Sequence, residues 1–148
     1  MSARDITVII TSFRSGEKIK NCLNSIDKEI KVLLIENSND SNIKKNIEKE
    51  FSNVECILTG ANFGYGKSNN IGLKKVITKY ALILNPDTTL HPTAIENFIK
   101  ITKKIDQFAI MGPYIQEEKD KENKNYLNNL QPAQVSNIKG FAMFLNLS

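Results

Sequence analysis

Between two apolar runs at 54–58 and 80–84, the sequence reads Asn62-Phe-Gly-Tyr-Gly-Lys-Ser-Asn-Asn70. Gly64 and Gly66 permit positive φ angles and let backbone N–H groups come close to a ligand. A helix predicted from about Ser68 would offer its free N–H groups and positive dipole end to phosphate oxygens. The alternative is a loop that needs glycine only for its turn, and this segment alone does not separate the two.

Strand-like and helix-like runs alternate on both sides of this segment. Short β-branched or aliphatic runs predict strands at 6–10, 31–36, 54–58, 80–84 and 108–111. Apolar residues at helical spacing predict the helices between them: Ile19, Cys22, Leu23 and Ile26; Ile43, Ile47 and Phe51; Ile71, Leu73 and Val76 or Ile77; and, with Pro92 in its first turn, Ile95, Phe98, Ile99 and Ile105. This alternation favours an α/β fold with a mostly parallel central sheet flanked by helices.

The pattern changes after Pro113. Residues 116–137 are polar, charged and rich in asparagine, which predicts a mobile loop, and residues 139–145 return as one more strand. A length of 148 residues is that of a single domain.

Composition excludes several classes of protein. The chain is 41% hydrophobic, which is typical of a globular protein, and no apolar run approaches the ~20 residues of a membrane span. The N-terminus lacks the apolar segment of a secretory signal, so we expect an intracellular protein. The formal charge of +4 is mild and mixed in sign, so it does not indicate nucleic-acid binding.

Cysteine and histidine are scarce. Cys22 and Cys56 lie inside apolar patterns, and we expect two buried thiols instead of a disulfide or metal pair. His91 is the only histidine, which excludes any site that needs two imidazoles.

Gly66-Lys67-Ser68 is similar to the end of a P-loop, G-x-x-x-x-G-K-[ST]. The first glycine of that motif would stand at position 61, which is Ala61, and Gly60 is one residue too early. The sequence therefore disfavours a P-loop hydrolase.

Polar residues follow the predicted strands, and ligands of open α/β sheets bind at the carboxyl ends of strands. Asp87 follows Asn85 and Pro86, and a carboxylate there can bind Mg or Mn, which then bridges phosphate oxygens. Alternatively, Asp87 caps a turn by accepting from the N–H of Thr89. Glu36 either accepts bonds from a ribose or base or is solvated, and we expect Asp40 to cap a helix.

Four segments in this order resemble family 2 glycosyltransferases of the GT-A fold: Val8-Ile-Ile-Thr-Ser-Phe13, Leu33-Leu-Ile-Glu-Asn-Ser38, Asn62-Phe-Gly-Tyr-Gly-Lys-Ser-Asn-Asn-Ile-Gly72 and Leu82-Ile-Leu-Asn-Pro-Asp87. They look closest to the rhamnosyltransferase-like branch, whose members show similar N-x-G-x-G-x-x-N-N and N-P-D segments. The likeness covers about residues 5–113, and residues 140–145 look like the family's next core strand. It implies that residues 1–148 form one Rossmann-like, nucleotide-sugar-binding GT-A domain, truncated at its C-terminus.

The resemblance also implies a site. Its nucleotide-sugar-binding residues would be Thr11, Ser12, Phe13, Glu36, Asn37, Ser38, Asn62, Gly64, Tyr65, Gly66, Asn70, Asn85 and Asp87. Glu36, where the family usually has Asp, would contact the base or ribose. Asp87 would hold Mg or Mn beside the diphosphate, with Asn85 in the position of the first acid of a D-x-D-like element.

The family's chemistry is inverting transfer of a sugar from a nucleotide diphosphate donor to an acceptor hydroxyl, which a general base deprotonates. In the family that base lies downstream of the strand matched by residues 140–145, and this sequence ends before it. Glu117, Glu118 and Asp120 lie in a Lys-rich polar loop, where we expect them to be solvated. We therefore expect the donor-binding part of a glycosyltransferase, with the catalytic residue unassigned. The alternative is a non-catalytic nucleotide-sugar-binding module that works with a partner chain.

By the same resemblance, the partners would be a nucleotide diphosphate sugar and a glycan or lipid-linked acceptor, without nucleic acid. The role would be cell-envelope polysaccharide biosynthesis, in the cytoplasm or at the inner face of the membrane. Peripheral membrane association and a homo-oligomer are compatible with this role.

Overall fold

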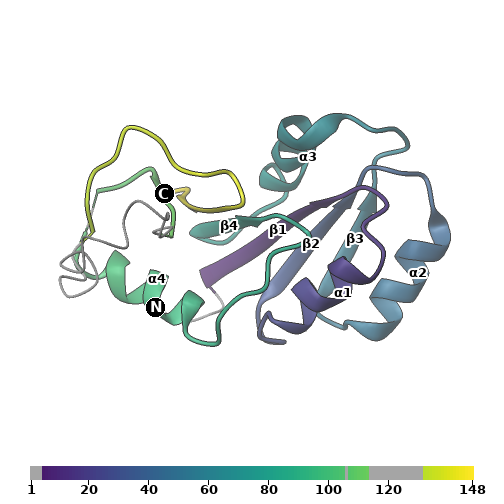
Figure 1. Ribbon diagram of the computed structural model, residues 1–148, viewed down its shortest axis with the longest axis horizontal. Coiled ribbons are helices and arrows are strands. Elements are labelled where there is room, and N and C mark those ends of the chain that lie inside the picture. The colour runs from purple at the N-terminus through teal and green to yellow at the C-terminus, as the bar shows by residue number, and fades with distance from the viewer. Residues whose placement is uncertain (1–4, 106, 114–131) are drawn as a thin grey trace, which may run out of the picture.

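The computed structural model describes residues 5–105, 107–113 and 132–148 (Figure 1). In chain order the elements are β1 (Ile6–Ser12), α1 (Glu17–Asn24), β2 (Lys31–Glu36), α2 (Ser41–Glu50), β3 (Val54–Leu58), α3 (Gly64–Leu73), β4 (Tyr80–Leu84), α4 (Ala94–Thr102), β5 (Ile110–Met111) and β6 (Ala142–Asn146). Strands and helices alternate as predicted, and the α/β fold is confirmed.

One six-stranded sheet, in the order β3-β2-β1-β4-β6-β5, forms the centre of the structure. β1 to β4 are parallel, so their carboxyl ends meet at one edge. β6 runs antiparallel to β4 and β5. The mostly parallel sheet is confirmed, while the direction of β6 was not predicted because an apolar run reads the same in either direction.

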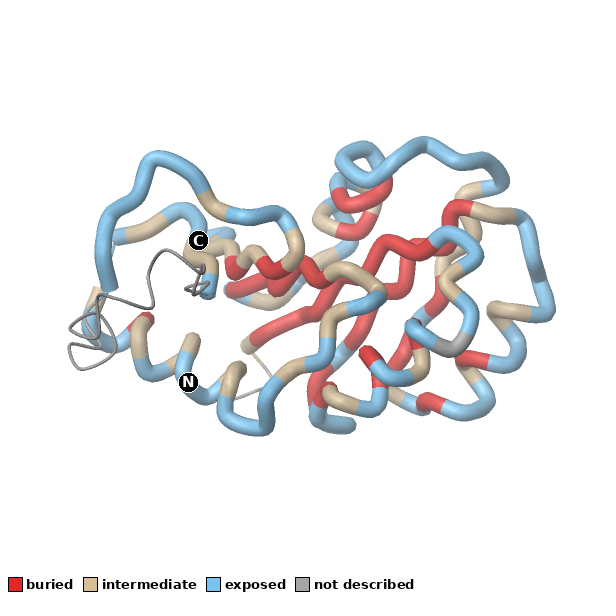
Figure 2. The backbone as a smooth tube through the Cα atoms, viewed as in Figure 1, coloured by how far each residue is buried: buried red, intermediate tan, exposed pale blue. Residues whose placement is uncertain are grey.

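Helices cover both faces of the sheet, as Figure 1 shows. Val8 and Ile10 of β1 face a core shared with α1, α2 and α4, whereas Ile9 faces a smaller core beneath α3. Successive strand residues point to opposite faces, so a strand covered on both sides is apolar throughout. Figure 2 shows the result as a band of buried strand residues.

Helix α3 differs from the prediction at both ends. It begins at Gly64 instead of Ser68, so the two glycines lie in its first turn and not in a preceding loop. Gly64 has a φ of +76°, whereas Gly66 takes an ordinary negative φ. The helix ends at Leu73, which leaves Ile77 95% exposed, and Val76 packs against the core instead.

Gly72 lets α3 approach the sheet closely. A Cβ atom at this position would lie 2.7 Å from Cγ2 of Ile9, which is closer than real side chains pack. The small residue therefore fixes the height of α3 above β1 and, with it, the position of the helix's first turn.

The remaining differences are at element ends. Pro92 precedes the helix it was expected to begin, because α4 takes Thr93 as its N-cap. β5 is confined to Ile110–Met111, β6 is shifted to Ala142–Asn146, and residues 132–137 of the predicted loop contain no helix or strand. Residues 116–131 of that loop, with Glu117, Glu118 and Asp120, lie outside the described residues.

Two further predictions concern burial and membranes. Cys22 and Cys56 are both buried and free, as predicted. Within the described ranges, no helix has the length and apolar character needed to cross a membrane.

Candidate functional site

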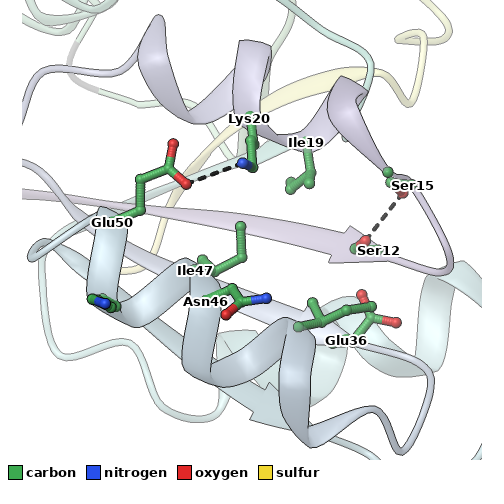
Figure 3. Close-up of a pocket in the computed structure, with 11 residues that line it drawn as sticks. Ser12, Ser15, Ile19, Lys20, Glu36, Asn46, Ile47 and Glu50 are labelled. Atoms are coloured by element: carbon green, nitrogen blue, oxygen red, sulfur yellow. Dashed lines mark hydrogen bonds and ion pairs between the residues drawn. The ribbon is translucent and has the colours of Figure 1, made fainter.

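A pocket of about 610 Å³ opens between α1 and α2, at the carboxyl ends of β1 and β2 (Figure 3). Its lining combines strand ends, the β1–α1 turn and the facing sides of two helices: Ser12, Ser15, Gly16, Ile19, Lys20, Glu36, Ile43, Asn46, Ile47, Lys49 and Glu50. Both the size and the position are those of small-molecule sites in open α/β sheets.

Glu36 supplies the pocket's buried carboxylate. The residue is 1% exposed, and neither carboxylate oxygen has a hydrogen-bond partner among the described residues. Buried polar groups are nearly always hydrogen-bonded, because leaving one unpaired costs free energy. Glu36 therefore keeps unused hydrogen-bond acceptors just beneath the wall of the pocket.

The rest of the pocket has apolar walls and a polar rim. Ile19, Ile43 and Ile47 contribute aliphatic surface from α1 and α2. At the rim, the Lys20 ammonium and the Glu50 carboxylate form an ion pair with an Nζ to Oε2 distance of 3.2 Å. This combination suits a flat, partly apolar ring that carries N–H donors.

Ser12 faces this pocket from the end of β1. Its hydroxyl donates to Oγ of Ser15 at 3.0 Å, across the turn that leads into α1. That turn contains two residues with positive φ, Arg14 at 53° and Gly16 at 54°. Of the predicted site residues, the pocket brings Ser12 and Glu36 together.

Thr11 and Asn37 point to the opposite face of the sheet. The Thr11 hydroxyl donates to Oδ1 of Asn69 at 2.8 Å, and the Ser68 hydroxyl donates to Oδ1 of Asn37 at 2.6 Å. These two buried bonds hold the first half of α3 against β1 and β2. Nδ2 of Asn69 is buried and has no hydrogen-bond partner in the part of the chain that is described.

The predicted residues near the start of α3 are exposed. Oδ1 of Asn62 accepts from the Gly64 N–H at 3.0 Å, which shapes the turn into the helix, and Gly66 and Asn70 lie on its outer side. The Tyr65 hydroxyl donates to the carbonyl oxygen of Gly140, and partial burial raises the pKa of this phenol. Tyr65 therefore links α3 to the segment that enters β6.

Aromatic side chains are exposed at this edge as well. Phe13, directly after β1, is 45% exposed, and Phe63, directly before α3, is 41% exposed. The Lys67 ammonium lies 4.0 Å from the centroid of the Phe63 ring. Such faces are available for stacking by a ligand ring.

Asp87 lies in the turn after β4 and is exposed. Asn85 fixes this turn through its backbone: its N–H donates to the Phe141 carbonyl at 2.9 Å, and its carbonyl accepts from the Thr88 N–H at 3.1 Å. Among the described residues the Asp87 carboxylate accepts no hydrogen bond, so the alternative cap on Thr89 is not formed.

The described part of the protein would supply only some of the ligands of a metal ion beside Asp87. The described residues contain no cluster of three or more His, Cys, Asp or Glu side chains able to hold a metal. Mg²⁺ commonly binds through one or two carboxylates together with substrate phosphates and water. Asp87 fits that arrangement, in which the ligand completes the metal site.

Cys22 lies beneath the same turn, with its Sγ 3.7 Å from the carbonyl oxygen of Asn85. Burial, and to a lesser extent the charge of Asp87, raises the pKa of this thiol to about 12. Because the thiolate is the nucleophile, Cys22 is inert at neutral pH.

Asp40 caps α2, as predicted. Its Oδ1 accepts from the N–H groups of Asn42 at 2.8 Å and Ile43 at 3.3 Å, while Oγ of Ser38 accepts from the Asp40 N–H at 3.4 Å. Both residues are therefore part of the helix start.

Sequence reasoning missed Ser15, which the β1–α1 turn brings to the pocket, and Asn46, which α2 brings to it. The spacing of Ile43 and Ile47 did indicate which side of α2 faces the sheet. Asn46, one position before Ile47, follows from that orientation, but the gap between α1 and α2 depends on how the helices pack.

Comparison with known proteins supports the resemblance found in the sequence. Residues 7–146 match glycosyl transferase family 2. The chain is 26% identical over 115 residues to the low-salt glycan biosynthesis hexosyltransferase Agl10 of Haloferax volcanii, with 75% of this chain and 36% of that protein covered. It is 20% identical over 127 residues to the N-acetylglucosaminyl-diphospho-decaprenol L-rhamnosyltransferase of Mycobacterium tuberculosis, with 76% of this chain and 41% of that protein covered. The chain thus spans less than half the length of these relatives.

Solved structures share the fold. The mannosyltransferase PcManGT of Pyrobaculum calidifontis, in complex with GDP-Man and Mn²⁺, has a TM-score of 0.74 and 11% identity, covering 96% of this chain and 44% of that one. S. aureus TarS in complex with UDP-GlcNAc has a TM-score of 0.64 and 16% identity, covering 93% of this chain and 44% of that one. The GT-A fold is confirmed, and since the family match extends over residues 7–146, the chain belongs to glycosyl transferase family 2.

Proposed function

We propose that residues 1–148 are the donor-binding domain of an inverting glycosyltransferase, and that they bind a nucleoside diphosphate sugar at the carboxyl edge of the sheet. The observation that carries this proposal is Glu36, a residue lining the α1–α2 pocket whose buried carboxylate has no hydrogen-bond partner within the described part of the chain. A nucleoside base would supply a flat ring for the aliphatic walls and N–H donors for an acidic lining residue.

The parallel strands place the proposed subsites in a row. β2 and β1 end at the base pocket, and β4, which pairs with β1, ends at the turn that holds Asp87. The diphosphate would run along this edge from Ser12 toward Asp87, beside the first turn of α3. Phe13 and Tyr65 would flank it.

A divalent cation, Mg or Mn, would bind between Asp87 and the diphosphate, where it neutralises the charge of the departing group. The protein's own contribution is the backbone hydrogen bonding of Asn85, which holds the turn and keeps Asp87 at the edge. The Mn²⁺ in the PcManGT complex supports this assignment.

Sugar transfer itself would follow from family membership. The acceptor would be a glycan or a lipid-linked saccharide, as the names of the curated relatives suggest, and the role would be in cell-envelope glycan synthesis at the cytoplasmic side of a membrane. A general base must take the proton of the acceptor hydroxyl. Separate assays of sugar transfer and donor hydrolysis distinguish a transferase from a module that binds the donor and needs a partner.

A thermal-shift panel tests donor binding. UDP, dTDP and GDP are each added with and without Mn²⁺, and a ligand at 100 times its dissociation constant should stabilise the protein by about 2.7 kcal/mol. Asp87→Asn should remove the Mn²⁺-dependent part of the shift. Asp27→Asn, in the turn before β2 at the opposite edge of the sheet, is the matched control and should keep it. A panel in which no diphosphate shifts the midpoint at millimolar concentration would refute the proposal.

A further inference from the structure

We propose that the outer edge of β3 is a surface through which two copies of this chain can pair, and that the Lys44–Glu48 ion pair of α2 keeps it closed. This inference is independent of the proposed nucleotide site. β3 is the first strand in the sheet order, so only its inner side pairs with another described strand, β2. An open strand edge presents N–H and C=O groups with which a second chain can pair.

The central residue of β3, Cys56, has both of its backbone groups bonded to side chains of α2. Its N–H donates to Oε1 of Glu48 at 2.8 Å, and its carbonyl oxygen accepts from the Lys44 ammonium. That ammonium also donates to Oε1 of Glu48 at 2.6 Å. Three hydrogen bonds therefore join Cys56, Glu48 and Lys44 in a closed ring at the edge of the sheet.

The bonded groups of Cys56 are those that point away from β2. In a parallel ladder each residue directs its N–H and C=O to the same side, and successive residues alternate. Val54 and Leu58, two positions away from Cys56, therefore direct their groups outward as well. The Val54 N–H donates to the Phe51 carbonyl oxygen at 3.1 Å, which closes the start of the edge. Cys56 is 1% exposed, so the centre of the edge is covered.

The ion pair lies on the surface, where it contributes little to the core. The side chains of Lys44 and Glu48 keep 39% and 33% of their surface exposed. Their i,i+4 spacing places both on one side of α2, which packs against β3 (Figure 1). Ion pairs as exposed as this one add little to stability. Its specific effect is to occupy the backbone groups of an edge strand, a device that prevents pairing between chains.

The partner that this edge fits is the β3 strand of a second copy. Two antiparallel β3 strands related by a two-fold axis at Cys56 would exchange both hydrogen bonds between their Cys56 residues. In this register Val54 of each copy lies opposite Leu58 of the other, and Glu55 lies opposite Ile57. No like charges face each other, and four of the five residues in Val54–Leu58 are apolar, which favours strand pairing.

The test is sedimentation velocity of the whole chain carrying Lys44→Ala/Glu48→Ala, measured over a range of concentrations. The variant loses one charge of each sign, so the net charge of +4 is unchanged, and alanine maintains the helix propensity of α2. We expect it to dimerise at least about tenfold more tightly than the wild type. Glu96→Ala/Lys100→Ala makes the same change at an exposed pair on α4 and should behave like the wild type.

Amide hydrogen exchange identifies the surface that pairs. In a dilute solution of the double variant, the Cys56 amide should exchange about tenfold or more faster than in the wild type, because its acceptor is gone. Raising the protein concentration should restore protection at Cys56 and increase it at Leu58. The variant Glu48→Gln retains a side-chain oxygen that accepts from the Cys56 N–H, so it should associate no more than the wild type does.

Three results would overturn the proposal. The first is equal association of the double variant and the wild type, or association that leaves the Cys56 and Leu58 amides unprotected. The second is equal association of Glu48→Gln and the double variant, which would assign the effect to charge and not to the bond that closes the edge. The third is an unfolded double variant, recognised by fast exchange in the central strand β1, because the pair would then support the fold.

Discussion

Ser12 and Glu36 are register partners at the carboxyl ends of the hydrogen-bonded parallel strands β1 and β2, and both face the α1–α2 pocket. Their chain neighbours Thr11 and Asn37 face α3 and bond to it. Strand alternation therefore separates two kinds of polar residue at one sheet edge. One face places Ser12 and Glu36 at the pocket, and the other face uses its polar groups to position α3.

Replacing Glu36 with methionine should stabilise the protein and abolish nucleotide binding. The change removes a buried carboxylate that has no partner among the described residues, so the free energy of unfolding should rise by about 1–3 kcal/mol. Urea unfolding measures this. Glu55→Met, at an exposed ion pair, should change stability by about 1 kcal/mol or less. A destabilised Glu36→Met would show that the carboxylate supports the fold instead of serving a ligand.

Thr11→Val should destabilise the protein by about 1–3 kcal/mol, because Oδ1 of buried Asn69 loses its donor. The double variant Thr11→Val/Asn69→Leu removes both partners and should lie closer to the wild type than the single variant does. Chemical denaturation of the four proteins in this cycle gives the coupling between the two side chains. Additive effects would mean that the bond contributes nothing to holding α3.

Gly72→Ala should also destabilise the protein, by about 1–3 kcal/mol, because the new methyl group would meet Ile9. Gly66→Ala is the matched control: it lies in the same helix, with open space around the added atom, and should gain up to about 1 kcal/mol from helix propensity. Thermal unfolding compares the two. Equal effects at both positions would contradict the close packing of α3 on β1.

Thiol reactivity should depend on unfolding. Burial raises the pKa of Cys22 to about 12 and that of Cys56 to about 11, from an ordinary value of 9.0. A thiol reagent at pH 8 should therefore label neither cysteine until urea unfolds the chain. Rapid labelling of the folded protein would contradict this burial.

The same pKa shifts make stability depend on pH. Above about pH 9 the unfolded chain releases thiol protons that the folded protein retains, so the unfolded state binds fewer protons. The thiol contribution to stability is therefore full below pH 9 and is lost as the pH rises toward 11–12. Urea unfolding at pH 8 and pH 10 should show this decline, and it should be smaller in Cys22→Ala/Cys56→Ala. If stability falls equally in that variant, the decline comes from titratable groups other than the two thiols.

The sequence predicted β2, β3 and β4 with their observed bounds because each is an apolar run closed by turn-forming residues. It misplaced the start of α3 because glycine is rare inside helices, and only the structure shows that Gly66 is helical. It placed Ser12 and Glu36 at strand ends but could not separate them from Thr11 and Asn37. Asn46 and Ser15 were missed because the pocket they line depends on how α1 and α2 pack together.

Amide chemical shifts report directly where a nucleotide binds on the protein. We predict that titration of the ¹⁵N-labelled chain with GDP and Mg²⁺ shifts the amide signals of Ser12, Gly16, Glu36 and Asn46 most strongly. Smaller shifts are expected at Gly64 and Asp87, and those of β5, at the far end of the sheet order, should not move. Saturable shifts clustered elsewhere, or no saturable shift at millimolar GDP, UDP and dTDP, would contradict a nucleoside diphosphate site at the carboxyl edge of this sheet.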